Sequence, residues 1–255
     1  FFDKTVFKRK YSSQHMTYID VSTAPERDHA DVLTEFLELS GKTVLDVGCG
    51  EGRITRILAK FGATVTGIDP GDRQLERARA AKINQNELYI KGSAEKLPSD
   101  DEVVDIVVFF NSLHHVPVNQ LGKAFSETHR VLKEMGLFYI GEPLAQGPQF
   151  ELSLPFNDET EVRAAAYDAI KACRTQGFEE LDETVYKTLS FFQNYEMFRE
   201  NSISIKPARE KYFNMNDSLM RERFRELGEF CQDGWYFPQY IRINLLAKTK
   251  NTRRI

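Results

Sequence analysis

The sequence predicts an α/β fold in which a mostly parallel sheet carries helices on both faces. Between residues 43 and 142, short apolar segments alternate with amphipathic helical segments, a pattern typical of parallel strands joined by right-handed crossovers. A glycine-rich turn follows the first apolar segment, TVLDV at 43–47. Ligands of such sheets bind beyond the carboxyl ends of the strands. The alternation therefore also predicts where a binding site lies.

Three helices are expected around the first two strands. The first is expected from Ala24, with Pro25 in its first turn and an apolar face of Val32, Leu33, Phe36 and Leu37. The second follows the glycines, ends at Gly62, and carries Ile54, Ile57, Leu58 and Phe61 at helical spacing. The third is expected to use Asp72 as its N-cap and to bury Leu75, Ala78 and Ile83.

Four more apolar segments complete the predicted parallel part of the sheet: TVTGID at 64–69, ELYIKG at 87–92, EVVDIVVFF at 102–110 and GLFYIGE at 136–142. The nearly continuous apolar character of TVLDV and EVVDIVVFF indicates strands covered on both faces. A helix closed by Gly136 separates the last two strands. The informative polar residues then fall at the strand ends, where the fold brings them to one edge.

The alternation stops after residue 142. Asp158, followed by Glu161 three positions later, has the capping-box arrangement that predicts a helix. ETVYKTLSF at 183–191 and YIRINLLAK at 240–248 predict an antiparallel hairpin on the sheet edge, the second strand having one polar face. Residues 190–235 would form a helical insert over the ligand edge, with a helix whose inward residues are Leu219, Phe224 and Leu227.

The chain is predicted to form a single domain with three parts: an N-terminal helical segment at 1–40, a cofactor-binding core at 41–145, and a substrate or lid region with the edge hairpin at 146–255. The dipeptide His15-Met16 raises the hypothesis that the native protein begins at Met16.

Composition narrows the class of partner. The formal net charge is -4 over 255 residues, which argues against nucleic acid as the main partner and favours a small molecule. The three cysteines show no C-x-x-C spacing, so neither a disulfide framework nor a zinc site is indicated, and a cytoplasmic location is expected. No apolar run approaches the roughly 20 residues that span a bilayer. The oligomeric state stays open.

The glycine turn differs from a dinucleotide-binding turn. Gly48, Gly50 and Gly52 follow Asp46 as D-x-G-x-G-x-G, and Arg53 occupies the third position of the G-x-G-x-x-G fingerprint. An acidic residue ahead of the glycines would repel a pyrophosphate and attract a cationic amino-acid ligand. The spacing therefore disfavours a nicotinamide reductase.

Four segments in order resemble the successive motifs of the class I S-adenosylmethionine-dependent methyltransferases: VLDVGCGEGRITRILAK, VTGIDP, GSAEKLP and VVFFNSLHHV. The resemblance covers roughly residues 43–143 and is strongest to the small-molecule group that includes ubiquinone and menaquinone biosynthesis enzymes. It implies a Rossmann-like fold with a seven-stranded sheet, with S-adenosyl-L-methionine as cofactor and S-adenosyl-L-homocysteine as product.

The resemblance also implies roles for the residues of the first two motifs. Asp46 would hold the amino end of the cofactor, through water or with backbone help. The turn residues Gly48, Cys49 and Gly50 would pass beneath its methionine and ribose parts. Asp69, followed by Pro70, would accept both ribose hydroxyls, a geometry that suits a carboxylate.

In the later motifs, Ser93, Ala94 and Glu95 would line the adenine and Asn111 would lie near the sulfonium. Many relatives carry Asp where this chain has Ser93, so the acceptor for the adenine amine is the Ser93 hydroxyl, Glu95 or a backbone carbonyl.

His114 and His115 are the candidate catalytic residues. Both follow the fourth strand, within expected reach of the transferring methyl, and either one has a side chain suited to general base catalysis near neutral pH. The alternative is that one packs in the loop and the other orients it. Glu142 would bind substrate or cap the loop before Pro143. No cluster with metal-ligand spacing is present in the sequence, so no metal is predicted.

These features predict an enzyme that transfers a methyl group from S-adenosylmethionine to an N, O, S or carbon atom of a small molecule. The alternative from another class is a non-catalytic S-adenosylmethionine-binding partner subunit or sensor, because intact cofactor motifs do not by themselves require turnover.

Overall fold

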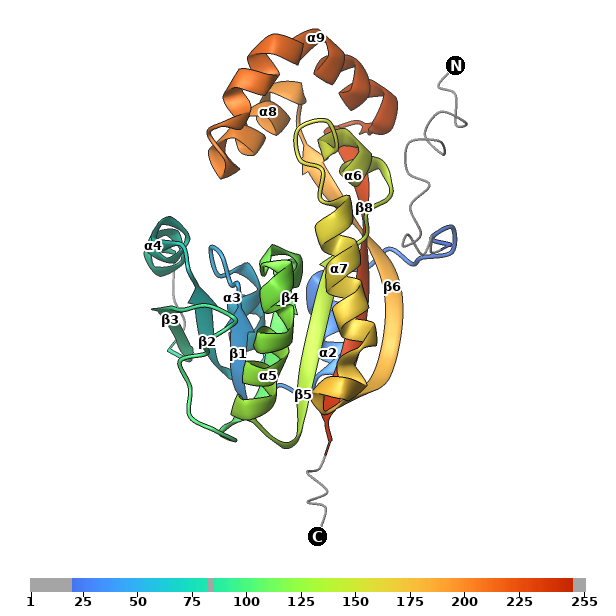
Figure 1. Cartoon of the computed structure of the whole chain (residues 1–255). Coiled ribbons are helices and arrows are strands. Elements are labelled where there is room, and N and C mark those ends of the chain that lie inside the picture. Colours follow the sequence, from blue (N-terminus) through green and yellow to red (C-terminus); the bar gives the residue numbers. More distant parts are fainter. Residues whose placement is uncertain (1–19, 82–84, 250–255) are drawn as a thin grey trace.

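A single mixed sheet forms the centre of the molecule (Figure 1). The computed structural model describes residues 20–81 and 85–249. The expectations for His15, Met16 and Ile83 lie outside these residues.

Strands of the first half are parallel and short, and those of the last part are antiparallel and long. The sheet order is β3-β2-β1-β4-β5-β8-β6, with β8 antiparallel to both β5 and β6. The strands are β1 (Thr43–Val47), β2 (Thr64–Asp69), β3 (Glu87–Lys91), β4 (Val104–Phe110), β5 (Leu132–Pro143), β6 (Phe178–Phe192) and β8 (Gly234–Lys248). This path has the predicted seven strands, and a short strand outside it, β7 (Glu229–Cys231), pairs with β8.

Helices cover both faces, as predicted. On one face lie α2 (His29–Phe36), α3 (Arg53–Lys60) and α4 (Asp72–Ala80), and on the other lie α5 (Leu121–Val131) and α7 (Thr160–Lys171). Beyond the sheet are α6 (Pro148–Ser153), α8 (Tyr195–Ile205) and α9 (Arg209–Leu227), and short 3-10 turns are η1 (Leu113–His115), η2 (Val118–Gln120) and η3 (Cys173–Gln176).

Two apolar layers hold these helices on the sheet. Leu33 of α2 and Leu58 of α3 are fully buried against strand residues such as Tyr139. On the opposite face, Phe125 of α5 packs against Phe138 at a ring distance of 5.4 Å. Each such side chain contributes about 1.5–3 kcal/mol through burial, which fixes the strand ends that form the site.

The first helix starts later than predicted, at His29 rather than near Ala24. Asp28 is its N-cap and accepts a hydrogen bond from the Ala30 amide. The preceding segment instead pairs with β6, because the Pro25 carbonyl accepts the Lys187 amide. The edge strand therefore competes with the helix for this backbone.

Two other predicted caps are displaced by one residue. Gly71, not Asp72, is the N-cap of α4, and Asp72 pairs with Lys91. Glu159, not Asp158, is the N-cap of α7, while the Asp158 carboxylate accepts from the Thr160 amide. Both acids still lie near the helix start, where negative charge is favourable.

The predicted hairpin and helical insert are present. β6 and β8 pair along most of their length, and the chain between them forms α8 and α9 in a lobe beyond the sheet (Figure 1). In α9, Phe224 is buried as predicted, but Leu219 is 48% exposed and Met220 is buried in its place. Phe213, Met220 and Phe224 form the inward face, because their spacing of seven and four residues places them on one side of a helix.

The polar face predicted for the last strand exists, but it is buried. Arg242 and Asn244 are 6% and 0% exposed, because α7 covers them. The Arg242 guanidinium lies 3.5 Å from the Tyr167 ring centre, and the Asn244 amide donates to Glu180 and Glu183. Partners on α7 and β6 thus replace the solvent expected there.

Candidate active site

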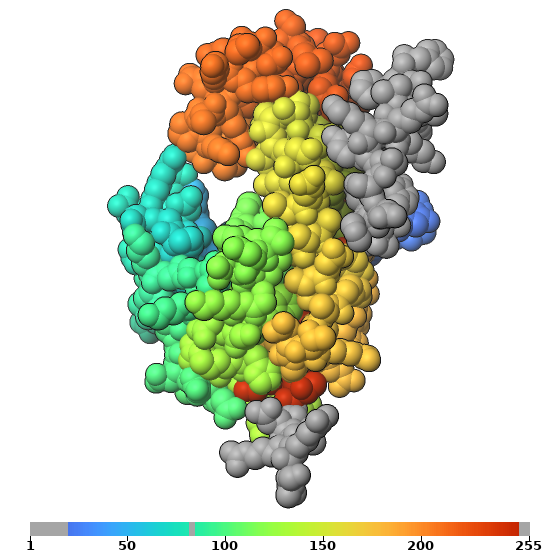
Figure 2. Space-filling view, viewed as in Figure 1, coloured from blue at the N-terminus to red at the C-terminus, as the bar shows by residue number. Residues whose placement is uncertain are grey.

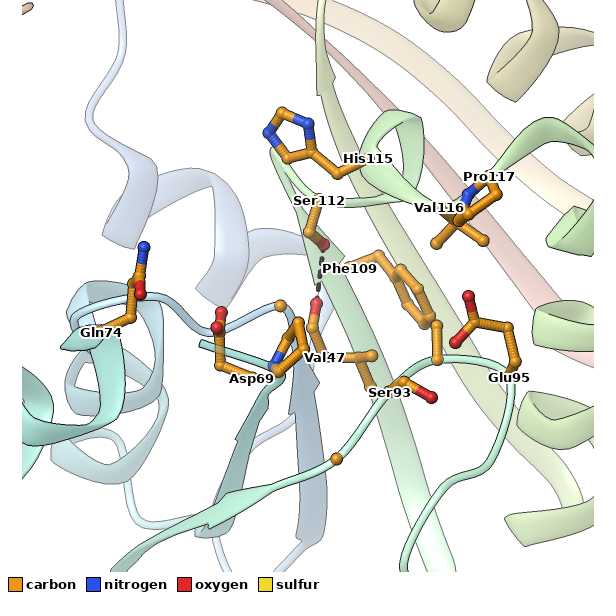
Figure 3. A pocket seen from close by; sticks show the side chains of 14 residues that line it. Val47, Asp69, Gln74, Ser93, Glu95, Phe109, Ser112, His115, Val116 and Pro117 are labelled. Carbon is orange, nitrogen blue, oxygen red and sulfur yellow. Dashed lines mark hydrogen bonds between the residues drawn. The ribbon is translucent and has the colours of Figure 1, made fainter. Parts of the chain in front are cut away.

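A cavity of about 380 Å³ opens at the carboxyl ends of β1, β2, β3 and β4 (Figure 3). Its size is typical of a small-molecule site. It is lined by Val47, Gly48, Asp69, Pro70, Gln74, Gly92, Ser93, Ala94, Glu95, Phe109, Ser112, His115, Val116 and Pro117. Seven predicted site residues are among them: Gly48, Asp69, Pro70, Ser93, Ala94, Glu95 and His115.

The glycine turn has two structurally different glycines. Gly48 has a φ of +75°, and a Cβ there would lie 2.4 Å from the Ser112 Cβ, so this glycine permits close packing of two loops. Gly50 has a φ of +53°, and no protein atom lies within 4 Å of where its Cβ would be. Gly50 is not among the lining residues, but its amide bonds Asp69 at the cavity, and the open space beside it leaves the backbone accessible to a ligand.

Asp69 closes the turn at the end of β2. One carboxylate oxygen accepts from the Gly50 amide at 2.9 Å and the other from the Gly71 amide at 2.8 Å. Each oxygen retains a lone pair for a further donor. The carboxylate is therefore held in place at the cavity and can accept two ligand hydroxyls, which fits the ribose of the implied cofactor.

Asp46 lies beneath the turn and is not among the lining residues. It is 1% exposed and accepts a hydrogen bond from the Thr55 hydroxyl at 2.6 Å. Burial raises the pKa of Asp46 to about 6, and repulsion from Asp69 adds to the effect. In this conformation Asp46 acts on a ligand through its charge and through the turn, without direct contact.

Cys49 and Asn111 also lie outside the cavity lining. Cys49 packs with Leu75, Ala78 and Tyr89, and burial raises the pKa of its thiol, which agrees with a backbone role for this residue. Asn111 has a φ of +54°, and its amide donates to the Gly141 carbonyl at 2.7 Å. It therefore shapes the start of the loop after β4.

The cavity lining also contains residues that sequence analysis had not selected. Gln74 of α4 lies on the same side as Asp69, and Val116 and Pro117 lie on the other side, near Glu95 (Figure 3). Ser112 donates to the Val47 carbonyl at 2.7 Å and so joins the ends of β4 and β1. The only sequence signal for Val116 and Pro117 is their position directly after the histidine pair.

Glu142, at the end of β5, holds the loop after β4. It is 2% exposed, one of its oxygens accepts from the Ser112 and Leu113 amides, and the other accepts from His114 Nδ1. The carboxylate therefore caps this loop, not the loop before Pro143. Its position also fixes the orientation of the His114 ring.

The two histidines have different surroundings. The ring of His115 is exposed and lines the cavity (Figure 3). The ring of His114 is buried beside it, with 4.1 Å between ring centres. His114 Nε2 lies 3.8 Å from an oxygen of Glu159, which also pairs with Arg163 at 2.7 Å.

The structure thus brings Glu159 close to the adjacent residues His114 and His115, and all three side chains are of types that bind metals. One ligand atom each from His114, His115 and Glu159 lies within 4.8 Å of the others. Glu159 lies between Asp158 and Glu161, whose capping-box spacing predicts the start of a helix and not a ligand, so spacing along the chain gave no signal for its role here.

The lobe of α8 and α9 lies beyond the carboxyl ends of the strands, and a notch opens between this lobe and the side of the molecule formed by α4 and α5 (Figure 2). Arg73 of α4 contacts the lobe, because it donates to the Ser204 carbonyl of α8 at 3.0 Å. Inside the lobe, an aromatic cluster includes Phe198, Phe213, Phe224 and Phe237. Most aromatic residues after the core are therefore packing residues of this lobe.

Together, the sheet order, the glycine turn and the acidic residue after β2 define a cofactor-binding α/β domain. Residues 45–140 match the family described as methyltransferase domain. The chain is 40% identical over 114 residues to an uncharacterized methyltransferase of Synechocystis, covering 44% of this chain and 52% of that protein. It is 34% identical over 108 residues to a ubiquinone biosynthesis O-methyltransferase of Pseudomonas paraeruginosa, covering 40% of this chain and 44% of that protein.

The YcgJ protein of Bacillus subtilis has a similar fold, with a TM-score of 0.60 and 20% identity over 88% of this chain and 99% of that one. Over residues 45–140 the chain therefore carries the cofactor-binding region of the S-adenosylmethionine-dependent methyltransferases. The matches span about half the length of the two curated relatives. Within residues 20–81 and 85–249, no helix is both long and apolar enough to cross a membrane.

Proposed function

We propose that this protein transfers a methyl group from S-adenosylmethionine to an N, O, S or carbon atom of a small-molecule acceptor, as a single methyltransferase domain. The observation that carries the proposal is the Asp69 carboxylate, which bonds the Gly50 and Gly71 amides at the cavity. It supports recognition of a ribose beside a backbone that leaves space for the rest of the cofactor.

In this proposal, the cofactor lies along the glycine turn. Gly48, Cys49 and Gly50 pass beneath it, and Asp46 contributes negative charge from below. Asp69 and Pro70 contact the ribose, and the segment of Ser93, Ala94 and Glu95 contacts the adenine. When bound, S-adenosylmethionine supplies an activated methyl group, so the chain's main task is to position the acceptor and exclude water.

His114 and His115 are proposed to act on the acceptor side, together with the loop that begins at Asn111. His115 borders the cavity, and His114 is held behind it by Glu142. The acceptor would enter through the notch between the lobe and the α4–α5 side (Figure 2). The net charge of -4 supports a cytoplasmic small molecule over a nucleic acid as substrate.

The direct test incubates purified protein with methyl-labelled S-adenosylmethionine and a small-molecule extract. Label should move into a compound that separates from the protein, and S-adenosylhomocysteine should accumulate in equal amount. Asp69→Ala should lose most of this transfer at low cofactor concentration, because the ribose contact is removed. Asp72→Ala is a matched control, since Asp72 is exposed and pairs with Lys91.

The alternative, a non-catalytic binding subunit or sensor, gives a different result. Calorimetry would then show cofactor binding that depends on Asp69, without label in any product from any extract. Absence of cofactor binding altogether would contradict both functions.

A further inference from the structure

A cluster next to the cavity has a composition that cofactor binding does not explain. His114, His115 and Glu159 each present a nitrogen or oxygen atom, and these atoms lie within 4.8 Å of one another. His115 lines the cavity, whereas His114 and Glu159 lie behind it. The cluster therefore borders the space in which an acceptor must meet the methyl group.

The hydrogen bonds of His114 determine what its second nitrogen can do. Nδ1 hydrogen-bonds the buried carboxylate of Glu142, and because an ionised carboxylate can only accept, the proton is assigned to Nδ1. In a neutral ring, Nε2 then has an unshared lone pair. That lone pair faces an oxygen of Glu159 at 3.8 Å, too far for a hydrogen bond. Two electron-pair donors that face each other in this way are stabilised by a cation between them.

The separation of these two atoms suits a single bound cation. Zn²⁺ binds histidine nitrogen at about 2.0–2.1 Å and carboxylate oxygen at about 2.0–2.2 Å, so two ligand atoms of a tetrahedral Zn²⁺ lie about 3.3–3.5 Å apart. The observed 3.8 Å is slightly wider than this, so binding would draw the two side chains together by about 0.3–0.5 Å. A ring nitrogen of His115 lies within 4.8 Å of a ligand atom on each of His114 and Glu159, so this exposed ring can become the third ligand by moving toward them.

The surroundings of the cluster also match those of a metal site. Histidine ligands commonly donate their other nitrogen to a carboxylate, which orients the ring, as Glu142 does for His114. Ligand carboxylates are commonly held by a further hydrogen bond, and Arg163 donates at 2.7 Å to the same Glu159 oxygen that faces His114. That oxygen keeps a second lone pair for a cation. Arg163 is in turn held by the Leu144 carbonyl at 2.9 Å.

We propose that His114, His115 and Glu159 form a binding site for a divalent transition metal of the Zn²⁺ type, with an open position toward the cavity. Two histidines and one carboxylate with an open position are the ligand set of a catalytic zinc site. The open position would hold an oxygen or nitrogen of the acceptor beside the methyl group. This role at the acceptor rests on the proposed methyl transfer, whereas metal binding itself does not.

The test uses cobalt alone as the probe. Protein freed of metal by a chelator is titrated with Co²⁺, whose visible absorption reports coordination by protein ligands, and Zn²⁺ is then added as competitor. We expect one Co²⁺ per chain, displaced by Zn²⁺. His115→Ala and Glu159→Gln should each weaken Co²⁺ binding about tenfold or more, and Glu142→Gln, which keeps all three ligands, about 10- to 100-fold.

Glu161→Gln is the matched control, because Glu161 is an exposed acid on the same helix; its Co²⁺ affinity should equal that of the unchanged protein. Circular dichroism and calorimetry with S-adenosylhomocysteine on every sample verify the fold and the cofactor site separately. The metal site is overturned if millimolar Co²⁺ fails to bind, or if the His115 and Glu159 variants bind it as tightly as Glu161→Gln does. Either result leaves the proposed methyl transfer standing when S-adenosylhomocysteine still binds.

Discussion

The cofactor half of the molecule, β1 to β4, and the half that follows, β5 to β8 with the lobe, are built on different principles. In the first half, short strands end in turns whose backbone amides and glycines form the site, as at Gly50 and Asp69. In the second half, long strands carry an aromatic lobe, and side chains from distant segments meet, as Glu142 and Glu159 do at His114. The geometry of the cofactor side is thus encoded by residues close together in the sequence, whereas the geometry of the acceptor side depends on contacts between residues far apart in the sequence.

The comparison predicts that substitutions in the aromatic lobe lower the free energy of unfolding most and leave the affinity of the cofactor site unchanged. Phe224 is 2% exposed and contacts several other aromatic rings. Phe224→Ala should lower the free energy of unfolding by about 3–5 kcal/mol, through lost burial and a cavity. Urea unfolding measures this loss, and calorimetry should show unchanged affinity for S-adenosylhomocysteine.

Phe230→Ala is the control for that experiment, because Phe230 is 66% exposed and should change stability by only about 0.5 kcal/mol or less. A large drop in cofactor affinity for Phe224→Ala would show that the two halves are energetically coupled, contrary to the comparison.

The contact between the two halves at His29 should make the free energy of unfolding depend on pH. His29 of α2 is 5% exposed, hydrogen-bonds the Tyr186 hydroxyl of β6 at 2.6 Å and packs on Phe110 of β4. Burial, followed by repulsion from Arg53, lowers the pKa of His29 to about 4. Because the folded pKa lies below the unfolded value, the neutral ring stabilises the fold above about pH 6.5, and this contribution of about 3 kcal/mol is lost as pH falls toward 4.

Urea unfolding at several pH values measures the effect as the difference between the unchanged protein and His29→Gln. That difference should shrink as pH falls through this window. Asp46 titrates in the same range with the opposite sign, since its raised pKa favours the fold at low pH, and subtraction of the two curves removes its contribution. A difference that stays constant with pH would exclude the buried neutral ring.

A smaller effect is expected on cofactor affinity alone. Asp69→Ala removes a carboxylate that holds two backbone amides, and it should weaken binding of S-adenosylmethionine by about 1–3 kcal/mol. Calorimetry measures this loss directly. Unchanged affinity would remove Asp69 from the proposed ribose contact.

The smallest effect separates two glycines of the same turn. Both glycines have a positive φ, and Gly48→Ala also places a Cβ 2.4 Å from the Ser112 Cβ, so it should lower stability by about 1–3 kcal/mol more than Gly50→Ala does. Gly50→Ala meets no protein atom and should lower stability by only about 1 kcal/mol, from its left-handed backbone, while it weakens cofactor binding. Thermal unfolding and calorimetry on both variants give the comparison, and equal stability losses would contradict it.

The accuracy of the sequence-based expectations follows the same division. The strands, the glycine turn and the place of Asp69 were predictable because each depends on residues close together in the chain. Helix starts were displaced where another element intervened, as when β6 pairs with the backbone at Pro25. Leu219 was expected inside, but Met220, four residues before Phe224, lies on the buried face, so the expectation missed this face by one residue.

The sequence by itself determined that parallel strands would end at one edge and that a glycine turn and an acidic residue would meet there. These features follow from the period of the hydrophobic residues, from backbone angles that glycine adopts most readily, and from the handedness of crossovers. Only the tertiary structure decided that Glu142 and Glu159 face His114 and that Arg242 is buried under α7. Such contacts join residues far apart in the chain, and no local spacing specifies them.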